Sequence, residues 1–275
     1  MKPAAFDYVR AAHIDEVMAL LGEEGDVVRV LAGGQSLVAM LNMRLAQPGV
    51  VVDISRLDAL KAIRQDAGAV VVPAAVRQAG LLQRPGLAGT HPLLAAAMPW
   101  IGHPQTRARG TVCGSLAHAD PSAELPLCLV ALEGAVTLRS KRGPREVAAV
   151  DFFQGLMTTA CADDEMIVEA RFPSRREGAG YAFREFARRD GDFAIVACAA
   201  VVTTEGIELT VGGVDDVPVR RQWGRLEGSA LDDALNELAW SLSARDDQHA
   251  DARLRRDLVR SMGRATIEEA QACSG

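Results

Sequence analysis

The chain has 275 residues, of which 49% are hydrophobic and 24% are charged, and its formal net charge is −6. This length allows a substantial core and more than one domain, and the acidic balance gives no reason to expect nucleic acid or an anionic membrane surface as a partner. The longest apolar run, 195–202, is too short for a membrane span, and the N-terminus lacks the apolar region of a signal peptide. We therefore expect no membrane span and a cytoplasmic location.

The cysteine count is odd and includes no C-x-x-C pair. A disulfide framework, an iron–sulfur cluster or a zinc site built from this chain alone is therefore not expected. At least four of the five cysteines are interpreted as small buried hydrophobic residues in a reducing compartment. The five are Cys113, Cys128, Cys161, Cys198 and Cys273.

The first sixty residues show the alternation of an α/β unit, with a glycine segment between a strand and a helix. The elements predicted in it are, in chain order, a helix over 14–21, a strand over 27–31, a helix over 37–45 and a strand over 50–54. The glycine segment Ala32-Gly33-Gly34-Gln35-Ser36 follows the first of these strands.

A second unit begins near Leu57 and carries a second glycine segment, Thr111-Val112-Cys113-Gly114-Ser115. Asp120-Pro121 predicts a helix start, because Asp is a preferred N-cap and Pro suits the first helical position. The elements predicted here are a strand over 69–73, a helix over 93–98, a helix from Asp120 to 132 and a strand over 136–140.

The order of predicted elements changes after the polar stretch 173–180, from mixed helices and strands to consecutive strands followed by helices. Strands predicted over 181–187, 193–202 and 207–211 form a three-stranded antiparallel meander, and helices follow over 231–242 and 252–272. We therefore expect an α+β protein with two α/β subdomains, 1–56 and 57–175, followed by a C-terminal α+β domain, 176–275.

The glycine segments suggest places where phosphate could approach the main chain, because glycine allows positive φ and leaves no Cβ in the way. Ser36, Thr111 and Ser115 add hydroxyl donors, while Gly114 adds room. The alternative for Gly-Gly-Gln-Ser alone is a tight turn with a serine N-cap, and it is favoured for an isolated copy. Two such segments suggest one long ligand with two phosphates, which we interpret as FAD.

The remaining polar candidates each have a plain alternative. Asp120 is interpreted either as a partner of ribose hydroxyls or as a helix cap, and His118 as a structural histidine rather than a base or ligand. Arg107 and Arg109 are interpreted either as partners of a pyrophosphate or as surface charges. No catalytic residue and no metal site are predicted.

Four segments together resemble the FAD-binding medium subunit of molybdenum hydroxylases, the family of xanthine dehydrogenase, carbon monoxide dehydrogenase and aromatic N-heterocycle dehydrogenases. These segments are Ala32–Leu37, Arg109–Ser115, Ala117–Pro121 and Gly191–Ile195. The resemblance implies a two-lobed FAD-binding domain whose glycine loops hold the pyrophosphate. It assigns cofactor contacts to Ala32, Gly33, Gly34, Gln35, Ser36, Leu37, Thr111, Gly114, Ser115, Asp120 and Phe193.

The sequence departs from the family pattern at two positions. Cys113 stands where the family usually has glycine, so its backbone is expected to have negative φ, and a passive role is favoured for its thiol. Phe193 stands where the family often has tyrosine near the isoalloxazine ring; its alternative is core packing in the meander.

The resemblance also implies that three different subunits carry out separate steps. A large molybdopterin subunit would hydroxylate a substrate, a small subunit with [2Fe-2S] clusters would carry the electrons, and FAD in this chain would deliver them to an external acceptor. One alternative is a self-contained flavin oxidoreductase, with Arg188, Asp190 and Asp192 as its only dense polar cluster. The other is a non-catalytic adaptor with structural loops.

Overall fold

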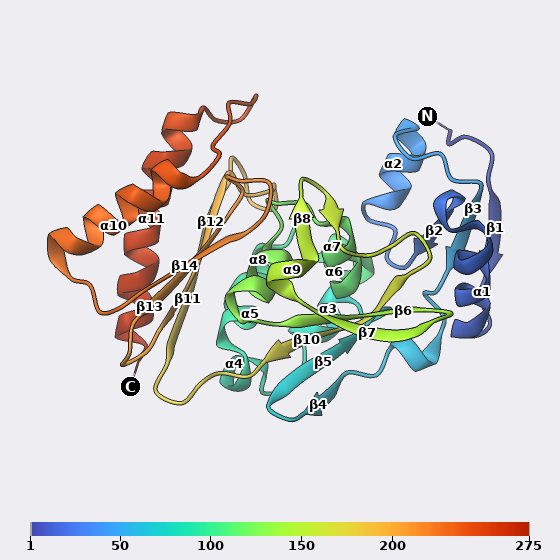
Figure 1. Cartoon of the computed structure of the whole chain (residues 1–275), viewed down its shortest axis with the longest axis horizontal. Coiled ribbons are helices and arrows are strands. Elements are labelled where there is room, and N and C mark those ends of the chain that lie inside the picture. The colour runs from blue at the N-terminus through green and yellow to red at the C-terminus, as the bar shows by residue number, and fades with distance from the viewer. Residues whose placement is uncertain (1, 275) are drawn as a thin grey trace.

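The computed structural model describes residues 2–274, which form three successive units around three β-sheets, with a short hairpin in the second unit (Figure 1). The first unit is at the right of Figure 1, the second in the middle and the third at the left. Within the described residues, no helix is both long enough and apolar enough to cross a membrane.

The first unit is a parallel three-stranded sheet in the order β1-β3-β2. Its elements are β1 (Asp7–Arg10), α1 (Ile14–Glu24), a 3-10 turn (Gly25–Val27), β2 (Val28–Leu31), α2 (Leu37–Met43) and β3 (Val50–Asp53). Val51 and Val52 are buried in the central strand, as expected for a β-branched run. Because the strands are parallel, β2 and β3 end at the same edge, where the first glycine segment begins.

The second unit contains a five-stranded sheet in the order β4-β5-β10-β6-β7. Its strands are β4 (Arg64–Asp66), β5 (Ala69–Pro73), β6 (Ala135–Ser140), β7 (Gly143–Ala148) and β10 (Met166–Pro173), and β8 (Phe153–Gly155) pairs with β9 (Thr158–Thr159) in the hairpin. Its α-helices are α3 (Gln78–Leu82), α4 (Leu87–Thr90), α5 (Pro92–Ala97), α6 (Pro104–Arg109), α7 (Val112–His118), α8 (Glu124–Ala131) and α9 (Ala149–Phe152). Asp58–Leu60 and Met98–Trp100 are 3-10 turns.

The third unit is an antiparallel four-stranded sheet backed by two helices. Its elements are β11 (Gly180–Phe186), β12 (Val196–Val202), β13 (Ile207–Gly212), β14 (Val219–Trp223), α10 (Gly228–Ser241) and α11 (Ala252–Ala272). Alternate residues of β11 and β12 face opposite ways: Ala182 and Cys198 pack toward α10 and α11, whereas Tyr181 and Phe183 join the core of the second unit.

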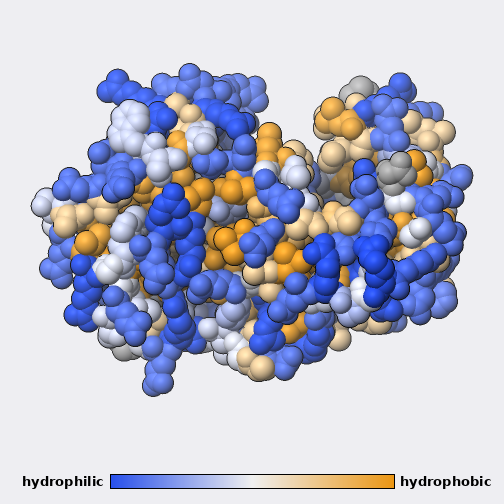
Figure 2. All heavy atoms as spheres, in the orientation of Figure 1, coloured by the Kyte–Doolittle hydropathy of each residue, from blue (hydrophilic) through white to orange (hydrophobic). Residues whose placement is uncertain are grey.

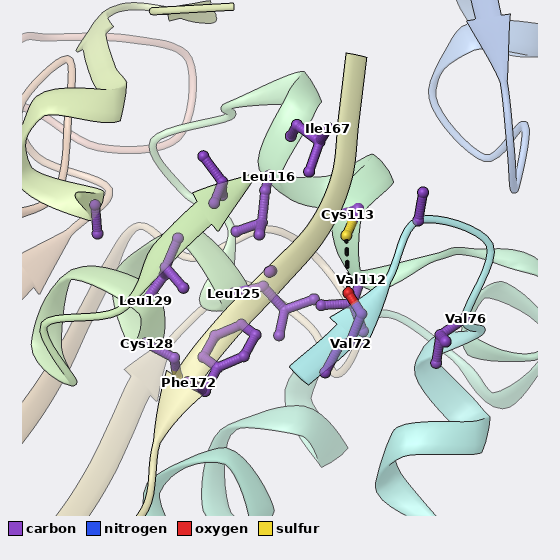
Figure 3. Close-up of a cluster of buried hydrophobic side chains, with 14 of the residues drawn as sticks. Val72, Val76, Val112, Cys113, Leu116, Leu125, Cys128, Leu129, Ile167 and Phe172 are labelled. Atoms are coloured by element: carbon purple, nitrogen blue, oxygen red, sulfur yellow. Dashed lines mark hydrogen bonds between the residues drawn. The ribbon is translucent and has the colours of Figure 1, made fainter. Parts of the chain in front are cut away.

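The junction is the contact between the second unit and this inner face of the third sheet, where α5 packs on β11 and α8 packs on β12 and β13. One continuous apolar core runs from the first unit through the second and into this junction. Figure 3 shows part of it, with Leu125 and Leu129 of α8 beside Phe172 of β10.

The mixed helix and strand architecture confirms the α+β class, and the structure refines two details. The sheet of the second unit is antiparallel rather than of the α/β type, because β10 inserts between β5 and β6. The third sheet has four strands instead of three. The extra strand, β14, is a half-exposed edge with polar residues at its centre, so its sequence lacks a strand pattern. The boundaries 1–56, 57–175 and 176–275 stay predictions.

Candidate functional site

The first glycine segment turns sharply between β2 and α2. Gly34 has a φ of +73°, a left-handed conformation that favours glycine. Ser36 stands at the N-cap position of α2, but its side chain makes no capping hydrogen bond. The serine cap considered from the sequence is therefore wrong, and the Ser36 hydroxyl is available to a ligand.

The main-chain amides of this segment are also available. Within the described part of the chain, the amides of residues 32–36 donate no hydrogen bond to a protein acceptor. Four of these five residues are only half-buried, and Gln35 is exposed. Successive amides without protein acceptors form the kind of concave donor surface that binds anions.

The fold brings the two glycine segments into contact at Gly33. A Cβ at Gly33 would lie 2.6 Å from the carbonyl oxygen of Arg109 and 3.0 Å from the amide nitrogen of Thr111. No side chain fits into that space, so glycine is required for the close approach. The contact places the start of α2 and the start of α7 on the two sides of one site.

The second glycine segment uses more of its hydrogen-bonding groups internally. Thr111 is buried at the N-cap of α7, and its Oγ1 accepts from the Gly114 amide at 3.1 Å. A Cβ at Gly114 would lie 2.5 Å from that same oxygen, so this glycine makes room for the cap. Ser115 is half-buried, and among residues 2–274 its hydroxyl has no recorded partner.

The nearby arginines divide into two that bond main-chain carbonyls, Arg107 and Arg77, and an exposed one, Arg109. Arg107 donates from Nη1 to the carbonyl oxygens of Pro99, Ile101 and Gly102, at 3.1, 2.7 and 2.8 Å, so it braces the loop before α6. Arg77 donates to the carbonyl of Arg109. The side chain of Arg109 is exposed at the end of α6, beside Gly33.

Cys113 lies inside α7, has helical backbone and is buried. Its Sγ donates to the carbonyl of Val72 at 3.3 Å, as the dashed line in Figure 3 shows. Burial raises the pKa of this thiol far above its usual range, and the charge of Glu169 adds to the effect. The negative φ expected at this position is confirmed, and a thiol that stays protonated is unreactive.

Asp120 closes a turn before α8. Its Oδ1 accepts from the Ser122 amide at 2.9 Å, and α8 begins only at Glu124. The helix start predicted at Asp120 is therefore wrong by several residues, because this local bond competes with the helix. Oδ2 of Asp120 has no recorded partner among residues 2–274.

Phe193 lies in the loop between β11 and β12 and is 61% exposed. Its interpretation as a core residue of the meander is therefore wrong. It lines a cavity of about 540 Å³ together with Pro121, Ser122 and Leu156. The ring thus shares a wall with the segment that follows Asp120.

Two ion pairs lie around this cavity, whereas the Asp192 carboxylate, which also lines it, has no side-chain partner among residues 2–274. Arg245 bonds Asp216 at 2.7 Å, and Arg255 bonds Asp247 at 2.5 Å. Arg188 contacts Nδ1 of His249 at 3.4 Å. In the described part of the chain, no cluster of three His, Cys, Asp or Glu residues could hold a metal ion.

Three residues near the site have no signal in the sequence that predicts their position. Leu156 is an exposed apolar residue at the β8–β9 turn, and nothing in its local sequence signals a cavity wall. The buried Glu124 and the half-buried Glu185 are carboxylic acids on either side of the junction. Glu124 stands in a helical stretch and Glu185 in a strand, so neither has a sequence signal of its own.

These donors fit a dinucleotide with a pyrophosphate. The first segment supplies amides that have no protein acceptor, Ser36 and Ser115 supply hydroxyls, and neither segment carries an acidic side chain. In the orientation of Figure 1, the surface is hollowed between the first unit and the β8 hairpin, with apolar atoms on both sides (Figure 2). The fold and the site define a flavin-dinucleotide-binding protein.

Comparison with known proteins agrees over almost the whole chain. Residues 4–175 match the FAD binding domain in molybdopterin dehydrogenase, and residues 181–270 match the CO dehydrogenase flavoprotein C-terminal domain. The nicotine 6-hydroxylase medium subunit of Paenarthrobacter nicotinovorans is 39% identical, with 99% of each chain covered.

Solved structures show the same similarity. Carbon monoxide dehydrogenase from Hydrogenophaga pseudoflava matches with a TM-score of 0.95 and 30% identity, covering 100% of both chains. Quinoline 2-oxidoreductase from Pseudomonas putida 86 matches with a TM-score of 0.92 and 31% identity, covering 99% of both. The chain belongs to the family of FAD-binding medium subunits of molybdenum-dependent dehydrogenases.

Proposed function

We propose that this chain binds FAD between its two glycine segments and serves as the electron-transfer subunit of a molybdenum hydroxylase. The observation that carries this proposal is the contact of Gly33 with Arg109 and Thr111, beside main-chain amides that have no protein acceptor. Bound FAD supplies the redox chemistry, accepting electrons and passing them on. The protein supplies binding, orientation and access.

The proposed cofactor contacts divide by chemistry. The amides of Ala32, Gly33, Gly34, Gln35 and Ser36, with Leu37 at the start of α2, would surround one side of the pyrophosphate. The hydroxyl of Ser115 would donate from the other side. Thr111 and Gly114 would act by holding α7 in place, since their polar groups bond each other at 3.1 Å.

Asp120 and Phe193 are the proposed contacts away from the phosphates. The free Oδ2 of Asp120 can accept from ribose hydroxyls, and the exposed ring of Phe193 offers a face to the isoalloxazine. Their shared surroundings support this pairing, because Pro121 and Ser122 line the cavity that Phe193 lines.

The partners follow from the relatives and from the cysteines. One relative is named as a subunit of a dehydrogenase complex and others as medium subunits or chains. We propose a small iron–sulfur subunit as electron donor, a large molybdopterin subunit as the site of hydroxylation, an external electron acceptor and a cytoplasmic location. The medium-subunit relatives, which match this chain over almost its whole length, support this assignment over a self-contained oxidoreductase.

FAD titration of the full chain tests the proposal, with flavin fluorescence as the readout. The wild-type chain should bind roughly one FAD, and Gly33→Ala should weaken binding at least about tenfold, because the added Cβ forces the segments apart. Gly80→Ala is the matched control, since a Cβ there meets nothing within 4 Å. A folded wild-type chain that binds no FAD, or a Gly33→Ala chain that binds normally, would overturn it.

A further inference from the structure

Two carboxylic acids, the buried Glu124 and the half-buried Glu185, lie on the two sides of the junction. Glu124 lies in the first turn of α8 and is 4% exposed. Glu185 lies on β11 in register with Ala197, on the strand face that also carries Tyr181 and Phe183. That face packs against the second unit, so both acids point into one interface.

Little positive charge compensates this pair. Oε2 of Glu185 is buried and has no hydrogen-bond partner in the described part of the chain. Burial raises the pKa of Glu124 to about 7, and the charge of Asp120 adds to the rise. Burial raises the pKa of Glu185 to about 8, with a further contribution from the charge of Glu124.

The other charged groups around the pair are already engaged. Arg107 lowers the pKa of Glu124, but its Nη1 is held by three carbonyl oxygens of its own loop. On the sheet, β12 presents Ala197, Ala199 and Val201 to this interface. The buried Glu208 of β13 is neutralised by arginines, with Arg176 and Arg220 each at 2.9 Å.

The pair lies beside the two walls of the proposed flavin site, which are the Asp120 turn and the Phe193 loop. Glu124 begins the helix that follows the Asp120 turn, and Glu185 stands near the end of the strand that leads into the Phe193 loop. The same region is tied by the Gly213 amide, which donates to the Pro121 carbonyl at 2.8 Å. Repulsion between two ionised carboxylates here would push the Asp120 turn away from the Phe193 loop.

We propose that Glu124 and Glu185 are positioning residues that must keep at least one proton between them, so that FAD binding weakens when both ionise. This inference rests on the proposed function. At neutral pH the pair holds a proton and the two walls stay together. Above the range in which both acids ionise, two like charges share a desolvated interface, and the ionised pair favours separation of the walls.

The test measures the FAD dissociation constant of the full chain between about pH 6 and about pH 9. For the wild type it should rise about tenfold or more across this range, because binding requires the protonated pair. Glu185→Gln and Glu124→Gln should flatten the rise to less than about threefold. Glu205→Gln changes an exposed acid on the turn at the other end of the sheet, so its FAD dissociation constant should rise with pH as that of the wild type does.

Two outcomes overturn the inference: a wild-type dissociation constant that does not change with pH, or Gln variants that keep the wild-type slope. A chain that binds no FAD even at about pH 6 contradicts the proposed function instead. If the variants fail to fold, the test is calorimetry of FAD binding to the wild type at about pH 8 in two buffers of different ionisation enthalpy, which measures the protons taken up on binding. Net proton uptake on binding supports the inference, whereas binding without proton uptake overturns it.

Discussion

The two ends of the junction treat buried carboxylates in opposite ways. At the paired end, Glu208 is 6% exposed and bonds Arg176 and Arg220, and these arginines hold its pKa below the usual range although burial opposes this. At the acidic end, formed by Asp120, Glu124 and Glu185, burial raises both glutamate pKa values. A desolvated carboxylate therefore keeps a fixed charge where guanidinium partners are present and becomes a titrating group where they are absent.

The largest effect is expected from breaking the paired end. Arg220→Met should lower the free energy of unfolding by about 2–4 kcal/mol at neutral pH, because it leaves Glu208 with a single arginine in a desolvated place. Urea unfolding followed by circular dichroism measures the change. Arg221→Met is the matched control, since Arg221 is exposed on the same strand. Equal stability of the two variants would contradict the contrast between the ends.

A smaller effect of opposite sign is expected at the acidic end. Folding raises the pKa values of Glu124 and Glu185 above 4.5, so their stabilising contribution is complete below that pH and is lost as pH rises through about 7 and about 8. Glu185→Gln should therefore raise the unfolding free energy by about 1–2 kcal/mol at about pH 9 and change it little at about pH 5.

Unfolding of the apoprotein at both pH values measures this effect, with Glu205→Gln as the control for the loss of a charge. Glu208 should show the reverse dependence, because its lowered pKa gives stability that is present above 4.5 and lost as pH falls. A Glu185→Gln gain that is the same at both pH values would show that the carboxylate does not titrate in this range.

The smallest effect is expected on the opposite face of β11. Arg184 bonds Glu269 of α11 at 2.8 Å, but the two side chains are 48% and 45% exposed. Glu269→Ala should cost no more than about 0.5 kcal/mol, and added salt should reduce the cost further. The measurement is urea unfolding at low and high salt. A loss comparable to that of Arg220→Met would mean that exposure does not decide the contribution of an ion pair here.

The sequence predicted the glycine segments well because their chemistry is local. A strand followed by Gly-Gly gives a turn at Gly34, and the φ of +73° there is what such a turn requires. The contact between Gly33 and Arg109 is not local, because it depends on how the first two units pack. From the sequence, the segments were paired by their similar phosphate-binding chemistry, which does not predict this contact.

Other predictions were wrong or absent because tertiary structure decides the features concerned. Phe193 extends an apolar run that predicts a strand from this residue, but the strand begins only at Val196 and the ring is exposed. β10 carries Glu169 and Arg171 within an apolar strand, so its pattern is broken, yet it lies at the centre of the second sheet. Glu185 has an ordinary alternating position, and only the packing of the second unit on β11 makes it a half-buried acid.

The position of β10 also sets the order in which the molecule can assemble. Its residue Glu169 is in register with Pro73 of β5, and Ala170 with Val136 of β6, so the central strand of the second sheet is its last in the chain. During synthesis, the first unit can form its parallel sheet soon after it is made, whereas the second sheet must wait for β10. The surface that holds the second glycine segment is thus completed late, and a ribosome-bound chain that ends before β10 carries only half of the proposed cofactor site.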